Sequence, residues 1–362
     1  MFLLHLNQTA SCCRAYSEAL DASKPITFYL DKWQAESKQL DQGVQLLGCE
    51  HCWKDEDQGL ISYRLQYPDL IENNVIEIFM SNLCNQMCSY CSPKYSSVWQ
   101  DAMTEHGLFK GVSTTANNNL TPLAKLEDHS EYWLSQIHNY VTTCPDNSVS
   151  IKLLGGEPLM QIKSLEKLLK FNKNKIQSIG ITTNLNPPNN KFLHWLLNNI
   201  PNKKLQFQIS LDSTPDYNHI PRAGFNRNSF LENLNLLIQH QIEFKFMSIV
   251  SVLSVFDLGN FILWIKQNNF KLGFGKVNNP TCLSLAYLPK EFKIKIWQTI
   301  QHLEVPELIR ELLEKSDDMV DLKLIEQYNY LNQYFSRSGT DPLTTDNALF
   351  TEYWTWLKEK HK

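Results

Sequence analysis

Six apolar runs alternate with amphipathic helical patterns from Val75 onward, and this alternation constrains the fold more than any other feature of the sequence. It is typical of parallel βαβ units, whose right-handed crossovers curl a sheet toward a barrel or an open barrel. In such folds the chemistry lies at the carboxyl ends of the strands. We therefore expect an α/β fold. The predicted strands are 75–80, 149–154, 176–182, 205–211, 244–253 and 272–277, and the predicted helices are 132–141, 164–171, 191–198, 229–239 and 258–268.

One interval within this alternation, and both of its flanks, have other patterns. The interval 92–148 is too long for a simple crossover, and its polar tract 113–119 indicates a mobile excursion. After Pro289 the periodicity is helical. We expect short strands over 2–6 and 27–30, a helix over 32–47, and C-terminal helices over 290–314, 322–337 and 349–360.

Charge and hydropathy narrow the class of protein. The 34 basic residues are outnumbered by 38 acidic ones, which removes the usual electrostatic argument for a nucleic-acid partner. No run approaches the length of about 18 apolar residues that a membrane span needs. The N-terminal MFLLHLNQTASCC has no basic start and too short an apolar run for a secretory signal. We expect a cytoplasmic protein without a membrane partner.

The cysteines are grouped in a way that core residues are not. There are nine, and only Cys144 and Cys282 stand alone. Disulfides seldom persist in the cytoplasm, whereas several thiolates on short loops suit one soft metal or cluster. The candidate metal ligands are therefore Cys12, Cys13, Cys49, Cys52, Cys84, Cys88 and Cys91.

The sharpest group, Cys84, Cys88 and Cys91, follows the first predicted strand. Each of three thiolates can ligate one iron of a four-iron cluster, which leaves the fourth iron without a protein ligand. A substrate or cofactor can bind at that open iron. The alternative is a structural zinc site, but zinc in such sites takes four ligands, usually as CxxC pairs.

The CxxxCxxC spacing, with Tyr90 directly before the last cysteine, resembles the radical S-adenosylmethionine (radical SAM) superfamily. The resemblance implies a partial (β/α)6 TIM-like barrel and a 4Fe-4S cluster whose open iron is chelated by the amino and carboxylate groups of SAM. In that family, one-electron reduction cleaves the sulfonium to give a 5′-deoxyadenosyl radical. The three cysteines would then be the catalytic cluster ligands.

The second predicted strand runs into Gly155, Gly156 and Glu157, similar to the family's GGE motif. Glycines permit backbone conformations and close approaches that a side chain would block, and a carboxylate accepts hydrogen bonds from a cationic amine. The resemblance implies that this segment holds the methionyl amino group of SAM. In isolation, a Gly-Gly turn with a solvated glutamate would explain the same residues.

Later strand ends supply further candidates for SAM contacts. The resemblance implies that Ser210 and Asp212 face the ribose and methionyl end, and that Arg222 pairs with the SAM carboxylate. Asp212 is equally suited to capping the following helix. After the third strand, Leu185 stands where the family often has the glycine of a TNG-like turn. Ser248, Val277 and Asn278 match ribose- and adenine-contacting positions, although such residues are usually packing.

The N-terminal cysteines resemble an auxiliary-cluster module of the SPASM and twitch type. That pattern generally has another cysteine upstream of the double Cys, and none precedes Cys12 here. Three alternatives are open for the ligands of this metal site. Cys12 and Cys13 both bind the metal, His51 or Cys282 supplies the missing ligand, or one iron lacks a protein ligand and is open to substrate. Zinc is an alternative occupant of this second site.

We divide the chain into a twitch-like unit over 1–72, a radical SAM partial barrel over 73–288 and a helical extension over 289–362. Auxiliary-cluster enzymes frequently modify peptides or proteins, so the resemblance implies a peptide or protein substrate and an electron donor such as a flavodoxin or ferredoxin. Two alternatives stay open. One is a radical SAM enzyme acting on a small metabolite or nucleotide-derived compound, and the other is a non-catalytic iron-sulfur or zinc protein.

Overall fold

The computed structural model describes residues 2–3, 7–11, 16–57, 59, 62, 65, 74–124, 129–314 and 320–361. The chain folds as two compact units, each built from several segments. The first comprises Met1–Ser81, Lys125–Thr182 and Lys191–Gln206, and the second comprises Asn82–Ala124, Thr183–Asn190 and Phe207–Lys362.

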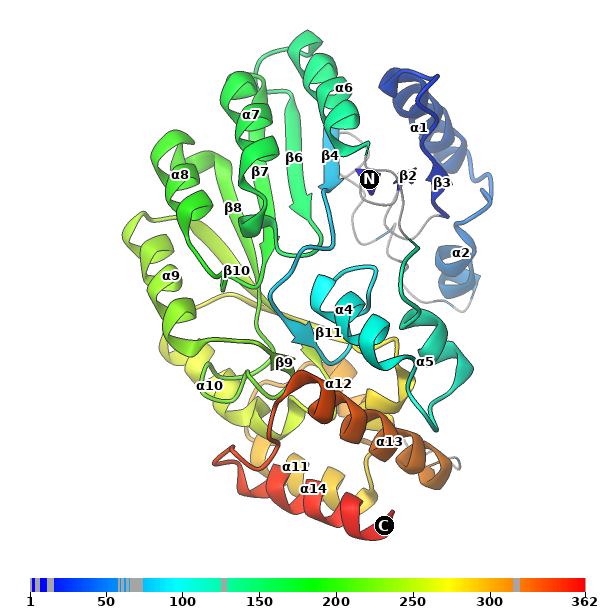
Figure 1. The fold of residues 1–362 in the computed structure, drawn as a ribbon, viewed down its shortest axis with the longest axis vertical. Coiled ribbons are helices and arrows are strands. Elements are labelled where there is room, and N and C mark those ends of the chain that lie inside the picture. The colour runs from blue at the N-terminus through cyan, green and yellow to red at the C-terminus, as the bar shows by residue number, and fades with distance from the viewer. Residues whose placement is uncertain are drawn as a thin grey trace. The chain divides into compact units, whose positions relative to one another are not determined.

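The first unit is built on parallel strands. In Figure 1, β4 (Asn74–Phe79), β6 (Val149–Leu154) and β7 (Ile176–Thr183) lie side by side, with α6 (Ser130–Thr143) and α7 (Ile162–Asn172) packed along them. Alternate residues of β6 are buried, as expected for a strand with one face on a core. The helix α8 (Lys191–Asn199) and the 3₁₀ turns η3 (Pro158–Met160) and η4 (Asn202–Lys204) complete this part.

Short N-terminal strands extend the same sheet. β1 (Phe2–Leu3) pairs parallel to β4, and β2 (Gln8–Thr9) and β3 (Glu18–Ala19) follow antiparallel. The predicted strand over 27–30 is wrong, because α1 (Ile26–Asp41) begins there. Pro25 precedes its first turn, and the buried Ile26 and Tyr29 are three residues apart on one helix face. The next helix is α2 (Glu50–Asp57).

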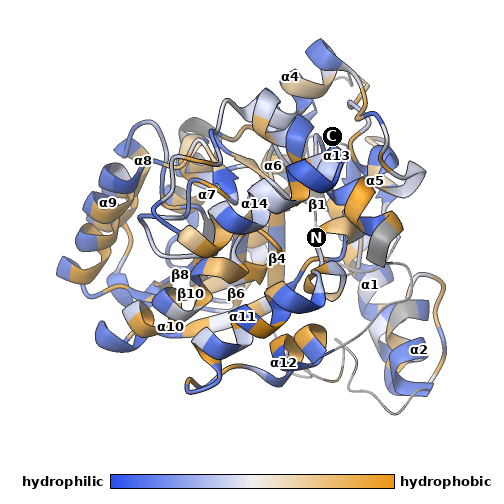
Figure 2. Cartoon of the chain, turned by 90° about the horizontal axis from the view of Figure 1, so that it is seen from below, coloured by the Kyte–Doolittle hydropathy of each residue, from blue (hydrophilic) through white to orange (hydrophobic). Residues whose placement is uncertain are grey.

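The second unit contains most of β8 (Leu205–Ser210), from Phe207 onward, together with β10 (Glu243–Val250) and β11 (Leu272–Lys276). β10 and β11 are parallel, and a separate antiparallel pair joins β5 (Met87–Cys88) to β9 (Arg222–Ala223). The helices between these strands are α9 (Arg227–Gln239) and α10 (Leu258–Gln267). Figure 2 shows hydrophobic and hydrophilic residues along both helices. The 3₁₀ turns are η5 (Val255–Asp257), η6 (Thr281–Leu283) and η7 (Leu285–Tyr287).

Helices form the rest of the second unit. The polar tract 113–119 is not an irregular excursion but α5 (Thr114–Asn119), whose first turn is capped by the Ser113 side chain. The predicted helix 290–314 is interrupted before Pro306 and gives two helices. The helical elements are α4 (Ser97–His106), α11 (Lys290–Ile300), α12 (Glu307–Glu314), α13 (Val320–Ser338) and α14 (Ala348–Lys360).

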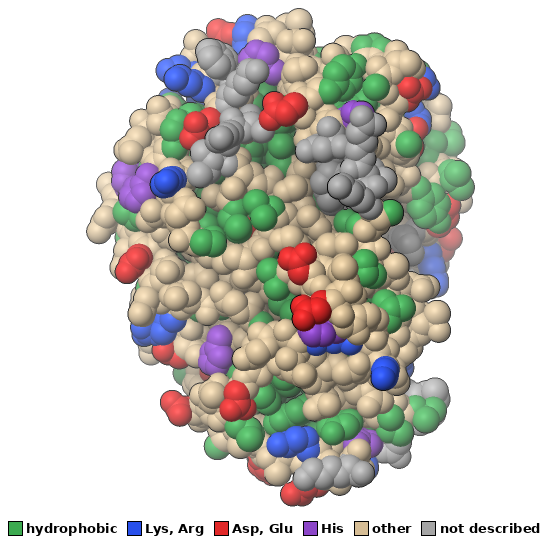
Figure 3. Space-filling model, in the orientation of Figure 1, with side chains coloured by type: hydrophobic (Ala, Val, Ile, Leu, Met, Phe, Trp, Pro, Cys, Tyr) green, Lys and Arg blue, Asp and Glu red, His purple; other side chains and the backbone are tan. Residues whose placement is uncertain are grey.

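These elements confirm the predicted α/β class, a partial barrel of six β/α units followed by a helical C-terminal region. The six predicted strands and the five helices between them occur within a few residues of their expected positions. On the face drawn in Figure 3, Lys and Arg side chains are interspersed with Asp and Glu. Across the part of the chain that the structure describes, no helix combines the length and apolar character needed to cross a bilayer.

Candidate functional site

The cysteine loop lies in the second unit, between Asn82 and the start of α4. Its short strand β5 pairs with β9, which puts Cys88 opposite Arg222. Cys88 is buried, while Cys84 and Cys91 are half-buried. Burial raises the pKa of the Cys91 thiol, and the neighbouring Cys88 and Cys84 raise it further. The three thiols therefore lie close enough to influence one another electrostatically.

Their arrangement differs from that of a single-ion site. Among the described residues, no three His, Cys, Asp or Glu side chains converge on a position for one metal ion. A four-iron cluster takes one thiolate for each iron, so its ligands do not share a metal.

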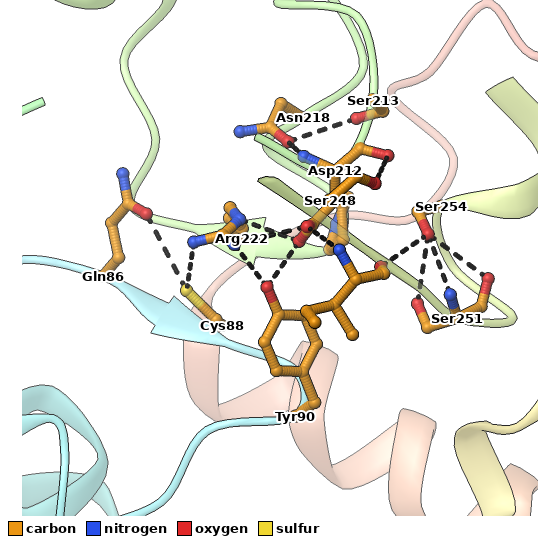
Figure 4. A network of polar contacts seen from close by, with 12 residues as sticks. Gln86, Cys88, Tyr90, Asp212, Ser213, Asn218, Arg222, Ser248, Ser251 and Ser254 are labelled. Atoms are coloured by element: carbon orange, nitrogen blue, oxygen red, sulfur yellow. Dashed lines mark hydrogen bonds and ion pairs between the residues drawn. The ribbon is translucent and has the colours of Figure 1, made fainter. Parts of the chain in front are cut away.

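A buried ion pair anchors the strand opposite the loop (Figure 4). Arg222 Nε donates to Asp212 Oδ2 at 2.8 Å, and the two side chains are 7% and 0% exposed. Arg222 Nη1 donates to the Cys88 sulfur at 3.5 Å, and Nη2 contacts the Tyr90 hydroxyl. A charged residue is thus held directly against one of the candidate cluster ligands.

Tyr90 completes this network. Its hydroxyl donates to Asp212 Oδ2 at 2.7 Å. Burial raises the pKa of the Tyr90 hydroxyl well above its ordinary value, so the phenol keeps its proton at neutral pH and remains a donor. The guanidinium of Arg222 lies over the Tyr90 ring, 5.5 Å from its centroid.

Asp212 has further partners that hold it in place. Its Oδ1 accepts a hydrogen bond from the Ile249 amide of β10 at 2.8 Å, and its own amide donates to Asn218 Oδ1 at 3.0 Å. Ser248 Oγ donates to the Asp212 carbonyl at 3.4 Å. The capping interpretation of Asp212 does not apply to α9, because Asn226 caps that helix. Ser210 is half-buried at the end of β8.

Carboxamide side chains join the loop to the segment after β7. Asn184 Nδ2 donates to Asn85 Oδ1 at 3.0 Å, and Asn85 Nδ2 donates to the Asn186 carbonyl at 2.6 Å. Leu185, between Asn184 and Asn186 in the sequence, has a φ of +52°, the left-handed conformation that glycine adopts more readily. The turn therefore keeps a glycine-like geometry without glycine. No sequence pattern predicts this network, because its members are about 100 residues apart.

The glycine pair lies in the first unit, directly after β6. Gly155 and Gly156 have φ values of +77° and +51°. A Cβ on Gly155 would lie 2.0 Å from Cζ of Phe79, so no side chain fits there. Glu157 is fully buried rather than solvated, and its Oε1 accepts a hydrogen bond from the Leu159 amide at 2.9 Å.

The N-terminal cysteines are only partly described. Cys49 and Cys52 flank the start of α2, where the Cys52 amide donates to the Cys49 carbonyl at 3.0 Å. Cys12 and Cys13 lie outside the described residues. Cys282 lies in the apolar core of the second unit, where burial raises the pKa of its thiol. Cys144 is buried at the end of α6.

Comparison with family models agrees with the cysteine motif. The model of the Radical SAM superfamily matches residues 78–254. The solved structure "Native anSMEcpe with bound AdoMet" is 17% identical with a TM-score of 0.40, and the match covers 57% of this chain and 52% of that chain. This chain therefore spans about half the length of that protein. No curated protein sequence matches the chain.

Two structures of Streptococcus suis SuiB are also similar. SuiB bound to S-adenosylmethionine is 13% identical with a TM-score of 0.40, and the match covers 78% of this chain and 65% of that chain. SuiB bound to the precursor peptide SuiA is 14% identical with a TM-score of 0.38, and the match covers 76% of this chain and 60% of that chain.

The buried ion pair makes a stability prediction. Asp212→Ala should lower the free energy of unfolding by about 3 to 5 kcal/mol, because it leaves the Arg222 charge buried without its partner. Asp216→Ala is the matched control, since Asp216 pairs with Arg227 where the side chains are 74% and 50% exposed. Exposed pairs contribute only about 0 to 1 kcal/mol. Urea unfolding measures both, and equal losses would contradict the assignment of Asp212 as a buried anchor.

Proposed function

We propose that the chain, whose residues 78–254 match the model of the Radical SAM superfamily, is an enzyme that cleaves S-adenosylmethionine at a 4Fe-4S cluster. The observation that carries the proposal is the CxxxCxxC loop, in which a buried Cys88 is held against Arg222. When bound, the cluster and SAM supply a 5′-deoxyadenosyl radical, which abstracts hydrogen from the substrate.

Two features of the loop fit such a cluster. Three thiols on one short segment supply a ligand for each of three irons. The hydroxyl oxygens of Ser89 and Ser92, next to two of these cysteines, are buried and have no hydrogen-bond partner among the residues that the structure describes. Buried hydroxyls are normally hydrogen-bonded, and sulfur atoms of a cluster are acceptors that would satisfy them.

We assign the SAM contacts to residues after the strands. Gly155 and Gly156 let the backbone approach the methionyl end, and Glu157 accepts hydrogen bonds from its amino group. Arg222 Nη1 is assigned to the SAM carboxylate, because Asp212 engages Nε and Nη2 and leaves Nη1 beside Cys88. Asp212 then acts by orienting the guanidinium, and Ser210 faces the ribose.

The proposed substrate is a peptide or protein. This follows from the resemblance of the Cys12, Cys13, Cys49 and Cys52 group to auxiliary-cluster modules, whose members frequently modify peptides. A second iron-sulfur cluster, or zinc, is proposed for these cysteines. We further propose a flavodoxin or ferredoxin as the source of the electron, and the reducing cytoplasm as the compartment.

Replacing the three loop cysteines together tests the cluster. The Cys84→Ala, Cys88→Ala, Cys91→Ala variant, reconstituted anaerobically, should hold about four irons fewer than the wild type and produce no 5′-deoxyadenosine. Cys144→Ala is the control, because it removes a buried thiol outside the motif and should keep full iron content. SAM cleavage by the triple variant would refute the proposal.

Glu157→Gln tests the amino-group contact. The variant keeps an oxygen for the Leu159 amide but loses the charge, so the fold should survive. Loss of a charge-assisted contact typically costs about 1.5 to 3 kcal/mol, which lowers SAM affinity roughly 10- to 100-fold. Calorimetric titration of the reconstituted protein measures this, and an unchanged dissociation constant would remove Glu157 from the SAM site.

The auxiliary site is tested by the double change Cys49→Ala, Cys52→Ala. Two thiols that flank one helical turn can reach the same metal, so their loss should remove the additional iron or zinc. SAM cleavage at the loop cluster should continue, uncoupled from substrate modification. Metal analysis and 5′-deoxyadenosine assays separate the two sites, and an unchanged metal content would show that Cys49 and Cys52 bind none.

A further inference from the structure

The helix α13 presents one continuous polar and aromatic face to the cysteine loop and the segment after α4. The contacting residues recur at the three- and four-residue spacing of a single helix face. Tyr330 and Tyr334 bond to the loop residues Ser89 and Met87. Four polar residues of the same face bond to the segment after α4, in the pairs Glu326–Ser113, Asn329–Gly111, Gln333–Lys110 and Arg337–Gly107.

Two of these contacts reach the backbone on either side of Cys88. Tyr334 donates its hydroxyl hydrogen to the Met87 carbonyl at 2.9 Å, and Tyr330 donates to the Ser89 carbonyl at 2.6 Å. Two neighbouring carbonyls of the loop also accept hydrogen bonds. The Gln86 carbonyl accepts one from Ser96 Oγ at 2.8 Å, and the Cys88 carbonyl accepts one from Trp99 Nε1 at 2.9 Å. Side chains thus bond four consecutive carbonyls of the loop.

Both tyrosines are fully buried, and their rings belong to an aromatic cluster with Trp99 and Phe109. The centroids of Phe109 and Tyr330 are 4.9 Å apart. Phenylalanine would fill the same volume without introducing a polar group into an apolar core. The Tyr330 hydroxyl is therefore explained by the loop carbonyl that it meets and not by packing. The Tyr334 hydroxyl is explained by the loop together with the segment paired to it, since it also contacts the Pro221 carbonyl and the Ala223 amide, each at 3.3 Å.

We propose that Tyr330 and Tyr334 are positioning residues that fix the backbone of the cluster-binding loop at Cys88. The inference rests on the proposed function, because the loop is taken to bind the cluster. It makes α13 part of the cluster site, although it begins more than 200 residues after the loop in sequence. With the peptide units on both sides of Cys88 held, the direction of its thiol is set before iron binds.

Tyr330→Phe and Tyr334→Phe, singly and together, test this proposal on the reconstituted protein. Each should release iron to the chelator bathophenanthroline roughly three- to ten-fold faster than the wild type, by the usual strength of one hydrogen bond. The double variant should also shift the electron paramagnetic resonance spectrum of the reduced cluster. Tyr353→Phe is the matched control, since Tyr353 is equally buried but bonds to Gln327 of α13 and not to the loop.

A second measurement uses the apo protein and does not depend on the cluster. Alkylation by N-ethylmaleimide, read by mass spectrometry, should be faster at Cys88 in the tyrosine variants and unchanged at the buried Cys144 of the first unit. Two results would overturn the positioning role. One is that the Tyr330 and Tyr334 variants release iron no faster than Tyr353→Phe, and the other is that Cys88 in the double variant is alkylated at the wild-type rate. A wild type that binds no iron would instead refute the proposed function, and the alkylation result would still decide the role of the tyrosines.

Discussion

The ion pair between Arg222 and Asp212 is the interaction on which the cysteine site depends. Neither charge can be buried without compensation, so the Asp212 carboxylate also accepts hydrogen bonds from Tyr90 and from the Ile249 amide. These partners belong to β9, the cysteine loop and β10, and the pair therefore ties three chain segments together. Because β9 is paired with β5, the same anchor holds Cys88 in place.

A second layer of contacts supports this anchor from the C-terminal region. The core of the second unit joins residues of α4, α10, α11, α13 and α14 into one apolar cluster that also contains Met87 and Ala223. The helical region is therefore packed directly against the strand pair that carries Cys88. In addition to this apolar packing, the hydroxyls of Tyr330 and Tyr334 form directional hydrogen bonds to carbonyls of the loop. Rigid support of this kind is what a metal centre needs, because ligand direction affects both affinity and redox behaviour.

The periodicity of the sequence was sufficient to predict the strands from Val75 onward, because alternation of strand and helix is a strong pattern. It failed at Thr27–Leu30, where β-favouring residues belong to a helix that buries Ile26 and Tyr29 and leaves Thr27 and Phe28 exposed. The cysteine motif identified the loop, but the partners of Arg222 and the asparagine network could not be predicted, since they depend on contacts between segments distant in sequence. Tyr330 and Tyr334 showed only helical spacing, which most often indicates packing.

We propose that Cys84, Cys88 and Cys91 hold a four-iron cluster with an iron open to S-adenosylmethionine. The most direct measurement is the electron paramagnetic resonance spectrum of the anaerobically reconstituted, dithionite-reduced wild-type protein, recorded with and without SAM. A ligand on the open iron changes its electronic environment, so we expect a reduced-cluster signal whose g values shift when SAM is added. A cluster signal that is identical with and without SAM would contradict it.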